Sequence, residues 1–286
     1  MQITKENLTI IIVTIKSEKV IDSCLKSIDP KIKKIIVENS SNRRFIESLK
    51  HKYENIECYL TGKNLGMGAG NNFGINKSNT RYVMILNPDT ILKPNTLDNI
   101  FKISKNLDFA ILSPISDNNN YPNYKKISNL KKSQQDLFEV SQIDGYSMIL
   151  DKDQFDNNFF DENIFMYLEN DDLCLRTKKN RQKIYVLKTS LINHLGAKTV
   201  NEMFTTELEL SRNWHWVWSK FYYNKKHYGF LKAYIKVLPI FISATLKMLF
   251  YFFLNKKKKE IYLFRVLGFV NAVIGKKSFY RPKIDY

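Results

Sequence analysis

Short apolar runs alternate with polar, helix-compatible stretches through the first two-thirds of the chain, and this alternation restricts the folds open to it. Continuous β-rich runs such as Leu8–Val13 (LTIIIV) and Tyr82–Leu86 (YVMIL) are typical of strands that are buried on both faces. Helix-compatible stretches lie between such runs, for example at residues 18–28, where we expect Ser17 to cap the helix, and at residues 95–105. This alternation predicts an α/β fold with a mostly parallel, Rossmann-like sheet.

Shorter apolar runs predict further strands at residues 34–37, 57–60, 109–113, 147–150 and 183–187. Two more helices are predicted over residues 66–77 and 171–180. The polar, Asn- and Lys-rich residues 117–142 are expected to form a loop. We therefore assign residues 1–205 to one α/β domain.

The charge balance is strongly basic, with 45 Lys and Arg against 28 Asp and Glu and a formal net charge of +17. Such an excess favours anionic partners, which include nucleic acid, acidic lipid and phosphorylated substrates. The sequence contains no recognised nucleic-acid-binding motif, so we expect no nucleic-acid partner. The cysteines, Cys24, Cys58 and Cys174, lie far apart without C-x-x-C spacing, which predicts reduced thiols in a cytosolic protein.

Residues 206–286 differ in character and predict a separate helical module that associates with a membrane. Val237–Leu254 is nearly all apolar over 18 residues, and the run Lys256–Lys259 follows it. A membrane-spanning helix needs about 20 apolar residues, so this length is borderline. The flanking aromatic residues and lysines favour a peripheral, amphipathic anchor on the cytoplasmic side of the cell membrane. A single membrane span and a buried homodimer interface are the alternatives.

Polar residues directly follow two of the predicted strands. Asn87-Pro88-Asp89-Thr90 ends one of them, and Glu38-Asn39-Ser40-Ser41 ends another. In open α/β sheets, ligands bind at the carboxyl ends of the strands. There, Asp89 can bind Mg²⁺ or Mn²⁺, and Glu38 can accept hydrogen bonds from a nucleotide base or ribose. Each segment taken alone is better explained as an ordinary polar turn.

Three later motifs are also candidates for chemistry. Residues 64–72 (NLGMGAGNN) are rich in glycine, which lets backbone approach a ligand closely, although they match neither the P-loop nor the dinucleotide fingerprint. Glu169–Arg176 (ENDDLCLR) begins a predicted helix, where Asn170 is suited to be the N-cap and an acid is suited to be a general base. His194 lies in a predicted loop near the end of the domain, where a lone histidine is more often structural than a ligand.

The order and spacing of these five motifs closely resemble glycosyltransferase family 2, and most of all its bacterial rhamnosyltransferase-like branch, over roughly residues 7–200. The resemblance implies the GT-A fold and an inverting, metal-dependent hexosyltransferase. It implies a nucleotide-sugar donor, with dTDP-L-rhamnose favoured. The implied acceptor is a surface polysaccharide or a glycan on a polyprenyl carrier that stays in the membrane.

The resemblance also implies roles for individual residues. The nucleotide-sugar-binding positions that match the family are Thr14, Glu38, Asn64, Gly66, Asn71 and Asn87. Asp89 matches the metal-binding carboxylate, and His194 matches a late histidine that helps hold the Mg²⁺ or Mn²⁺ ion or the diphosphate. The first strand departs from the family pattern, because Val13-Thr14-Ile15-Lys16-Ser17 stands where Val-Thr-Tyr-Asn-Ser is common.

A second departure concerns the catalytic base. Asn170 stands where the family usually has a catalytic Asp, and a neutral amide cannot accept a proton. We therefore expect Glu169 or Asp172 to serve as the base. Two alternatives are an acceptor that needs little help from a base and a catalytically impaired subunit that binds sugar nucleotides or recruits a partner to the membrane.

Overall fold

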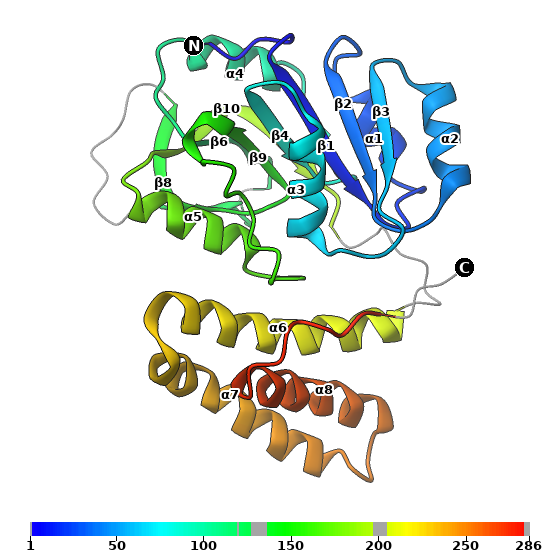
Figure 1. Cartoon of the computed structure of the whole chain (residues 1–286), viewed down its shortest axis with the longest axis vertical. Helices are drawn as coiled ribbons and strands as arrows, with labels where there is room; N and C mark the ends of the chain where they lie inside the picture. The colour runs from blue at the N-terminus through cyan, green and yellow to red at the C-terminus, as the bar shows by residue number, and fades with distance from the viewer. Residues whose placement is uncertain (1, 119, 127–135, 197–204, 283–286) are drawn as a thin grey trace. The chain divides into compact units, whose positions relative to one another are not determined.

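The computed structural model describes residues 2–118, 120–126, 136–196 and 205–282, and it divides the chain into two compact units (Figure 1). The first unit comprises residues 1–161 and 170–199, and the second comprises residues 162–169 and 200–286. The first unit is a sheet covered by helices, and the second is a bundle of helices.

The first unit is built on a ten-stranded sheet. Its strands are β1 (Leu8–Thr14), β2 (Lys33–Glu38), β3 (Ile56–Leu60), β4 (Tyr82–Leu86), β5 (Thr90–Leu92), β6 (Ile111–Ser116), β7 (Tyr124–Lys126), β8 (Leu137–Ile143), β9 (Ser147–Asp151) and β10 (Ile184–His194). Their order is β3-β2-β1-β4-β9-β6-β10-β8-β7, with β5 beside β10. The four neighbouring strands β3, β2, β1 and β4 pair in parallel, and so do β6 and β10. β9 lies between β4 and β6 and is antiparallel to both. The predicted α/β class with a large, mainly parallel sheet is confirmed.

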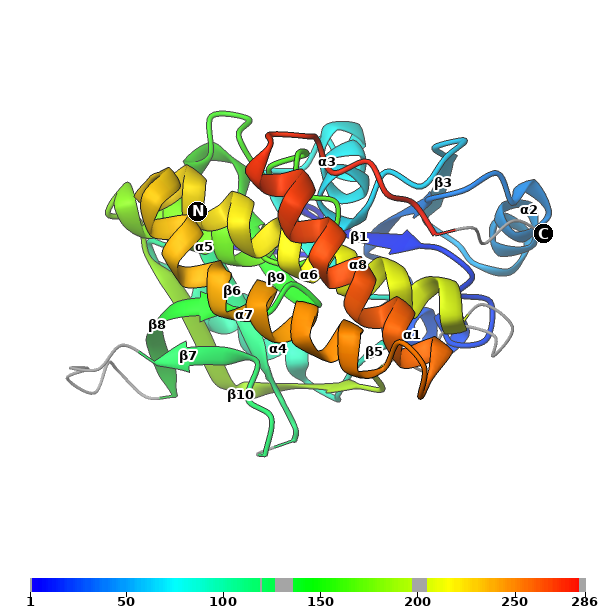
Figure 2. The same ribbon diagram turned by 90° about the horizontal axis from the view of Figure 1, so that it is seen from below.

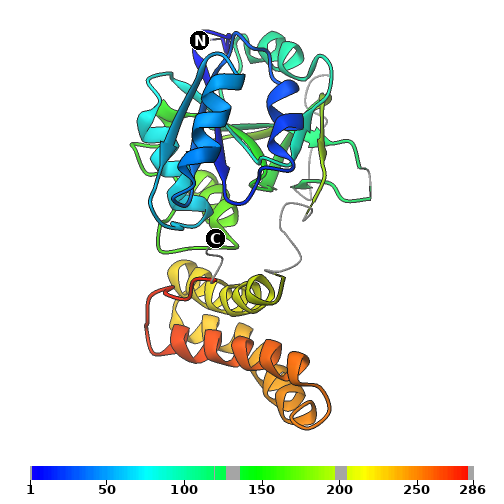
Figure 3. The same cartoon turned by 90° about the vertical axis from the view of Figure 1, so that its right-hand side faces the viewer.

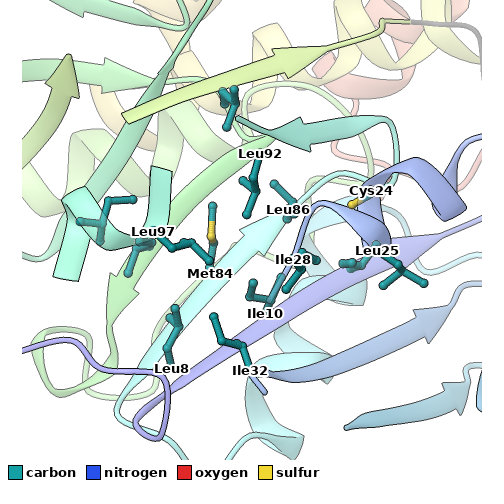
Figure 4. Close-up of a cluster of buried hydrophobic side chains, with 14 of the residues drawn as sticks. Leu8, Ile10, Cys24, Leu25, Ile28, Ile32, Met84, Leu86, Leu92 and Leu97 are labelled. Atoms are coloured by element: carbon teal, nitrogen blue, oxygen red, sulfur yellow. The ribbon is translucent and has the colours of Figure 1, made fainter. Parts of the chain in front are cut away.

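Helices cover both faces of this sheet. They are α1 (Ile21–Lys26), α2 (Arg43–Lys52), α3 (Met67–Lys77), α4 (Thr96–Ser104) and α5 (Glu169–Lys179), with a short 3₁₀ helix at Lys152–Gln154. Along β1, Ile10 and Ile12 pack with α1, α2 and α4, whereas Ile11 and Val13 pack with α3 and α5. Figure 4 shows part of the first of these two cores, in which Met84 of β4 belongs to the same cluster as Cys24 and Leu25 of α1. Figure 3 shows the same unit from the side, with α1 and α2 in blue.

Three predictions about local structure are wrong in part. The helix after β1 is shorter than predicted, because Ser17 does not cap it: α1 begins at Ile21, and the Ser17 hydroxyl donates to the Ile15 carbonyl at 3.1 Å instead. The predicted loop over residues 117–142 contains β7 and most of β8, which pair with each other. Residues 119 and 127–135 lie outside the described residues. The last strand runs on to His194, because pairing with β5 extends it beyond its apolar part.

Two glycines of α3 allow this helix to lie directly on β1. A Cβ atom added at Gly70 would lie 2.9 Å from Val13 Cγ1, and one added at Gly74 would lie 2.5 Å from Ile11 Cγ2. Both distances are shorter than two carbon atoms can approach without repulsion. These two glycines of the Gly-rich motif therefore serve helix–sheet packing, and they bring the start of α3 to the carboxyl end of β1.

We predict that Gly74→Ala destabilises the first unit, since the new methyl group would displace Ile11 in a packed core. Overpacking of this kind costs about 1–3 kcal/mol. The free energy of unfolding in urea measures the effect. Asn76→Ala is the matched control, because Asn76 is exposed on the same helix and alanine is the better helix former there. An unchanged stability for Gly74→Ala would contradict the close packing of α3 on β1.

The second unit contains α6 (Thr205–Tyr228), α7 (Phe230–Phe250) and α8 (Lys256–Val273), which pack against one another (Figure 2). Its core is aromatic, with Trp214, Trp218 and Phe221 of α6 packed against residues of α7 and α8. A Cβ atom at Gly268 would lie 2.4 Å from the Trp214 carbonyl oxygen, so α8 crosses α6 in close contact. The predicted helical C-terminal extension is therefore confirmed as a folded bundle.

Candidate active site

The candidate site begins at the carboxyl edge of the parallel strands. β1 ends at Thr14 and β2 ends at Glu38, and the parallel register sets these two residues side by side. β4 is the other neighbour of β1, and Asn87 directly follows its last residue. Because the carboxyl ends of parallel strands share one edge of the sheet, polar residues that are far apart in the sequence gather there.

Glu38 is a buried carboxylate that is held by two hydroxyl groups. Its side chain is 1% exposed, Thr14 donates its hydroxyl to Oε2 at 2.6 Å, and Ser40 donates to Oε1. Burial raises the pKa of Glu38, and these two hydrogen bonds oppose the rise. A carboxylate oxygen accepts more than one hydrogen bond, so Glu38 can still receive a ligand N–H or O–H group.

Asn39, to which the sequence prediction gave no role, ties β2 to the segment that precedes α3. Its amide donates to Asn64 Oδ1 at 3.2 Å and to the Gly66 carbonyl at 3.1 Å, and its Oδ1 accepts the backbone N–H of Leu65 at 2.9 Å. Gly66 has a φ of 88°, in the left-handed region that favours glycine, and it directly precedes α3. The segment from Asn64 to Gly66 is therefore fixed beside Glu38. Adjacency to Glu38 was the only sequence signal for this role.

Asn71 and Asn72 lie next to each other in α3 but differ in their hydrogen bonding. Asn72 exchanges two hydrogen bonds with the backbone of Phe160. Asn71 is 1% exposed, and its Oδ1 has no hydrogen-bond partner among the residues that the structure describes. A buried carbonyl oxygen without a partner costs about 1–3 kcal/mol, so Asn71 is the asparagine that is suited to accept a hydrogen bond from a ligand.

Asp89 and His194 lie side by side, joined by the pairing of β5 with β10. This antiparallel pairing sets His194 opposite Thr90, and His194 Nε2 is 3.3 Å from Asp89 Oδ1. Tyr146 stacks on the imidazole with 4.1 Å between the ring centroids, and its carbonyl accepts the backbone N–H of Asn87 at 2.9 Å. Tyr146 was not predicted as a site residue. It fixes the plane of the His194 ring beside Asp89.

The atoms around Asp89 suit a hard divalent cation. Asp89 is 6% exposed, and the Asn87 Oδ1 and Thr90 hydroxyl are buried without a hydrogen-bond partner in the described part of the chain. Oxygen atoms are the ligands that Mg²⁺ and Mn²⁺ prefer. Within the described ranges, no group of three or more His, Cys, Asp or Glu residues could hold a metal. The protein can therefore supply only part of a coordination shell, as is usual where substrate phosphates supply the rest.

The first turn of α5 contains Asn170 and Asp172 in different surroundings. Asn170 is inside the helix and is not its N-cap; its amide donates to the Ile143 carbonyl at 2.9 Å, and its side chain packs against Gly145. Asp172 is 0% exposed, and Arg176 donates Nε to its Oδ2 at 2.8 Å. Asn170 therefore supports the turn between β8 and β9, and Asp172 belongs to a buried ion pair.

Glu169, the first residue of α5, is counted with the second unit. Two further carboxylates interact near the start of α5: Asp171, which belongs to the predicted motif but was not singled out there, and Asp144, to which the sequence prediction gave no role. Gln142 donates its amide to Asp171 Oδ1. Burial raises the pKa of Asp144 and of Asp171, the charge of Asp144 raises the pKa of Asp171 further, and the charge of Lys125 lowers both.

The second unit has an exposed apolar surface. α7 buries Ala233, Val237 and Ala244 within the bundle. The apolar face of α7, by contrast, is exposed and consists of Leu231, Ile235, Ile242, Leu246, Leu249 and Phe250. It continues into the turn before α8, where Phe252, Phe253 and Leu254 are exposed, Phe253 by 93%. In the described residues, α7 is the one helix that is long and apolar enough to cross a membrane, by length and composition alone.

Comparison with known proteins finds, among others, one protein that is similar in sequence and two that are similar in fold. Agl10 of Haloferax volcanii, a low-salt glycan biosynthesis hexosyltransferase, is 27% identical over 216 residues, which are 69% of this chain and 69% of that protein. Staphylococcus aureus TarS (residues 1–349) has a similar fold, with a TM-score of 0.52 and 14% identity over 96% of this chain and 93% of TarS. The mannosyltransferase PcManGT of Pyrobaculum calidifontis, solved with GDP-Man and Mn²⁺, has a TM-score of 0.53 and 12% identity over 93% of this chain and 87% of its own.

These similarities confirm the predicted GT-A fold. The family model described as glycosyl transferase family 2 matches residues 9–174, which include β1 to β9 and the start of α5. Since this match spans more than half of the sequence, the chain belongs to glycosyl transferase family 2.

Proposed function

We propose that this chain is an inverting hexosyltransferase that moves a sugar from a nucleoside diphosphate donor to a surface-polysaccharide or lipid-linked glycan acceptor. The observation that carries the proposal is the pairing of Asp89 with His194 at the carboxyl edge of the sheet. Around this pair, the Asn87 Oδ1 and the Thr90 hydroxyl are buried without partners among the described residues. Such a group of oxygen and nitrogen atoms suits a diphosphate that shares a divalent cation with the protein.

The donor would lie along the strand ends, with its nucleoside beside Glu38 and Thr14. Two relatives support a nucleotide sugar: TarS has been solved with UDP-GlcNAc, and PcManGT has been solved with GDP-Man and Mn²⁺. Agl10 is described as a hexosyltransferase, which supports a hexose as the transferred sugar. The resemblance of the motifs to rhamnosyltransferase-like members makes dTDP-L-rhamnose the first donor to test.

Asp89 and His194 would hold the Mg²⁺ or Mn²⁺ ion. When bound, the ion supplies positive charge that stabilises the departing diphosphate. The chain's own residues prepare the site. Tyr146 stacks on the imidazole of His194 and so orients it, and Thr14 orients the Glu38 carboxylate by a hydrogen bond of 2.6 Å. A site held in this way loses little free energy to reorganisation when the donor binds.

We further propose that residues 1–205 carry the transferase and that residues 206–286 dock peripherally on the cytoplasmic side of the cell membrane. The apolar face of α7 and the turn after it expose large apolar side chains, and Lys256, Lys257 and Lys258 are exposed directly after them. Apolar side chains beside lysines fit the boundary between acyl chains and anionic headgroups. α7 also packs by one side in a soluble-type bundle, which favours an interfacial position over a span.

We predict that replacing all four lysines of the run Lys256–Lys259 with glutamine releases the protein from anionic vesicles. A lysine near an anionic surface contributes about 1 kcal/mol, so the partition coefficient should fall roughly 10²–10³-fold. Flotation with vesicles of phosphatidylglycerol and phosphatidylcholine measures this, with phosphatidylcholine alone as the neutral case. A matched control replaces four exposed lysines of the first unit, Lys19, Lys26, Lys102 and Lys105. Equal binding by both quadruple variants would contradict a role for the lysine run, and a wild-type chain that binds neither vesicle would contradict docking itself.

The test of the proposed function is a donor panel. Purified full-length chain is incubated with dTDP-L-rhamnose, UDP-glucose, UDP-GlcNAc or GDP-mannose and Mn²⁺ or Mg²⁺, and release of the nucleoside diphosphate is measured. We expect turnover of one donor that stops when EDTA is added. If no nucleotide sugar binds or turns over, the proposal is wrong.

One observation favours a second candidate function, a catalytically impaired subunit that binds sugar nucleotides. The amide of Asn170 stands at the family's catalytic position and is engaged with the backbone of Ile143. A chain that binds a donor but turns over none would support this alternative. Turnover of any donor that depends on a carboxylate of the site would exclude it.

A further inference from the structure

Asn170 lies against the turn between β8 and β9. It donates its amide to the Ile143 carbonyl at 2.9 Å, and a Cβ atom built at Gly145 would lie 3.4 Å from Asn170 Cβ. Asp144 is the residue between these two contacts. Asp144 therefore belongs to the turn that packs against position 170, where the family usually has its catalytic aspartate.

The carboxylates of α5 that lie in the first unit are already engaged. Asp172 is 0% exposed and bound to Arg176, so proton transfer at Asp172 would leave a partly buried guanidinium without its counter-charge. Asp171 accepts a hydrogen bond from the side-chain amide of Gln142 at Oδ1. A base must be able to turn an oxygen atom toward an incoming hydroxyl group. The ion pair holds Asp172 on Arg176, and the hydrogen bond from Gln142 fixes the orientation of the Asp171 carboxylate.

Asp144 differs from both of these residues. It is exposed, and within the described ranges its carboxylate has no hydrogen bond and no ion pair. Its backbone is nevertheless fixed, because its N–H donates to the Asn123 carbonyl at 2.8 Å and the flanking residues contact Asn170. A free carboxylate on a fixed backbone is the arrangement that a general base requires.

We propose that Asp144 is the general base of the transfer reaction and stands in for the carboxylate that Asn170 lacks, an assignment that rests on the proposed function. Asp144 lies close enough to interact electrostatically with Lys125 of β7, Asp171 and Cys174 of α5, His194 of β10 and the nearby Tyr146. His194 belongs to the candidate diphosphate site, so Asp144 is on the side of the sheet edge where the sugar would be bound. Partial burial raises the pKa of Asp144, and the charges of Lys125 and His194 oppose this rise without cancelling it. Asp144 therefore has more affinity for a proton than an ordinary aspartate has.

The step is a single displacement. Asp144 takes the proton of the acceptor hydroxyl as that oxygen forms a bond to the anomeric carbon of the sugar. The bond from the anomeric carbon to the diphosphate oxygen breaks, and its electron pair leaves with the nucleoside diphosphate. The proton ends on Asp144 and passes to solvent, to which the side chain is open.

The experiment compares Asp144→Asn with Asp171→Asn and Glu169→Gln in the full-length chain, with water as acceptor and the preferred nucleotide sugar and Mn²⁺ of the donor panel. We expect Asp144→Asn to lower kcat roughly 10²–10⁴-fold while the Kd for the donor changes less than about threefold. Because Asp144 is exposed and unpaired within the described ranges, its variant should unfold at the wild-type temperature. Asp171→Asn and Glu169→Gln should lower kcat less than about tenfold.

Three outcomes would overturn the assignment: a kcat for Asp144→Asn close to wild type, a loss of kcat that Glu169→Gln alone produces, or donor binding by the wild type without any turnover. Absence of donor binding by the wild type would instead overturn the proposed function. The two failures are therefore distinguishable, because donor affinity and turnover are measured separately.

Discussion

Replacing Asp89 with asparagine is expected to abolish sugar transfer and to leave the fold intact. Asp89 is the carboxylate of the site that closely follows β4 and pairs with His194 at 3.3 Å. Asparagine keeps the size of the side chain but removes the negative charge that a divalent cation needs. Loss of this electrostatic contribution should lower kcat about a thousandfold. Nucleoside diphosphate release from the preferred donor measures the effect.

The control for Asp89→Asn is Asp98→Asn, because Asp98 is an exposed aspartate of α4 in the same unit. Asp98→Asn should keep wild-type turnover. Thermal unfolding should show that both variants are folded. If Asp89→Asn turns over donor at a rate close to wild type, Asp89 has no role in the reaction and the proposed site is wrong.

The second large effect is expected from Asp172→Asn, and it is an effect on stability. Asp172 is 0% exposed and its partner Arg176 also donates to the carbonyls of Asn158 and Phe159. Removing one charge of such a buried pair leaves the other uncompensated, which costs about 3–5 kcal/mol. Urea unfolding measures this loss.

Lys178→Gln is the matched control, since Lys178 is on the same helix and pairs with Glu139 at 3.0 Å near the surface. Surface pairs of this kind contribute about 0–1 kcal/mol. A stable Asp172→Asn variant that has lost only turnover would identify Asp172 as the base, and would contradict both the structural role of the Asp172–Arg176 pair and the assignment of Asp144.

Most of the sheet could be predicted from the sequence, because its central strands are fully buried. β1 and β4 are nearly continuous runs of β-branched and other apolar residues, and β2 contains the shorter run Ile35–Val37. Burial on both faces requires that pattern. β7 and most of β8 were predicted as loop because they lie in the polar, Asn- and Lys-rich stretch of residues 117–142, although β8 itself (LFEVSQI) contains four apolar residues. Their strands form through pairing with distant partners, which local sequence does not encode.

The site was predictable where it depends on strand ends and was not predictable where it depends on tertiary contacts. Glu38 and Asp89 come at or just after the ends of apolar runs, so their place at the sheet edge follows from the fold class. Tyr146 and Asp144 acquire their positions from the turn between β8 and β9, and no motif marks them. Asn170 was recognised as a departure, but its hydrogen bond to Ile143 could not be foreseen.

The glycine-rich motif shows how one sequence pattern can serve two purposes. Gly66 precedes α3 in a left-handed conformation, beside the segment that Asn39 holds. Gly70 and Gly74 permit α3 to touch β1. From the sequence, the glycines were expected to let the backbone approach a ligand closely. For Gly70 and Gly74 the close neighbour is β1 instead.

Calorimetric titration of UDP, GDP and dTDP into the purified chain, with Mn²⁺ or with EDTA, tests the central claim of a metal-dependent nucleotide site most directly. We predict that one of these nucleotides binds in the presence of Mn²⁺, that EDTA weakens its binding, and that Asp89→Asn removes the Mn²⁺-dependent part. Binding that is the same with Mn²⁺, with EDTA and in the Asp89→Asn variant would contradict this claim, as would the absence of binding by all three nucleotides.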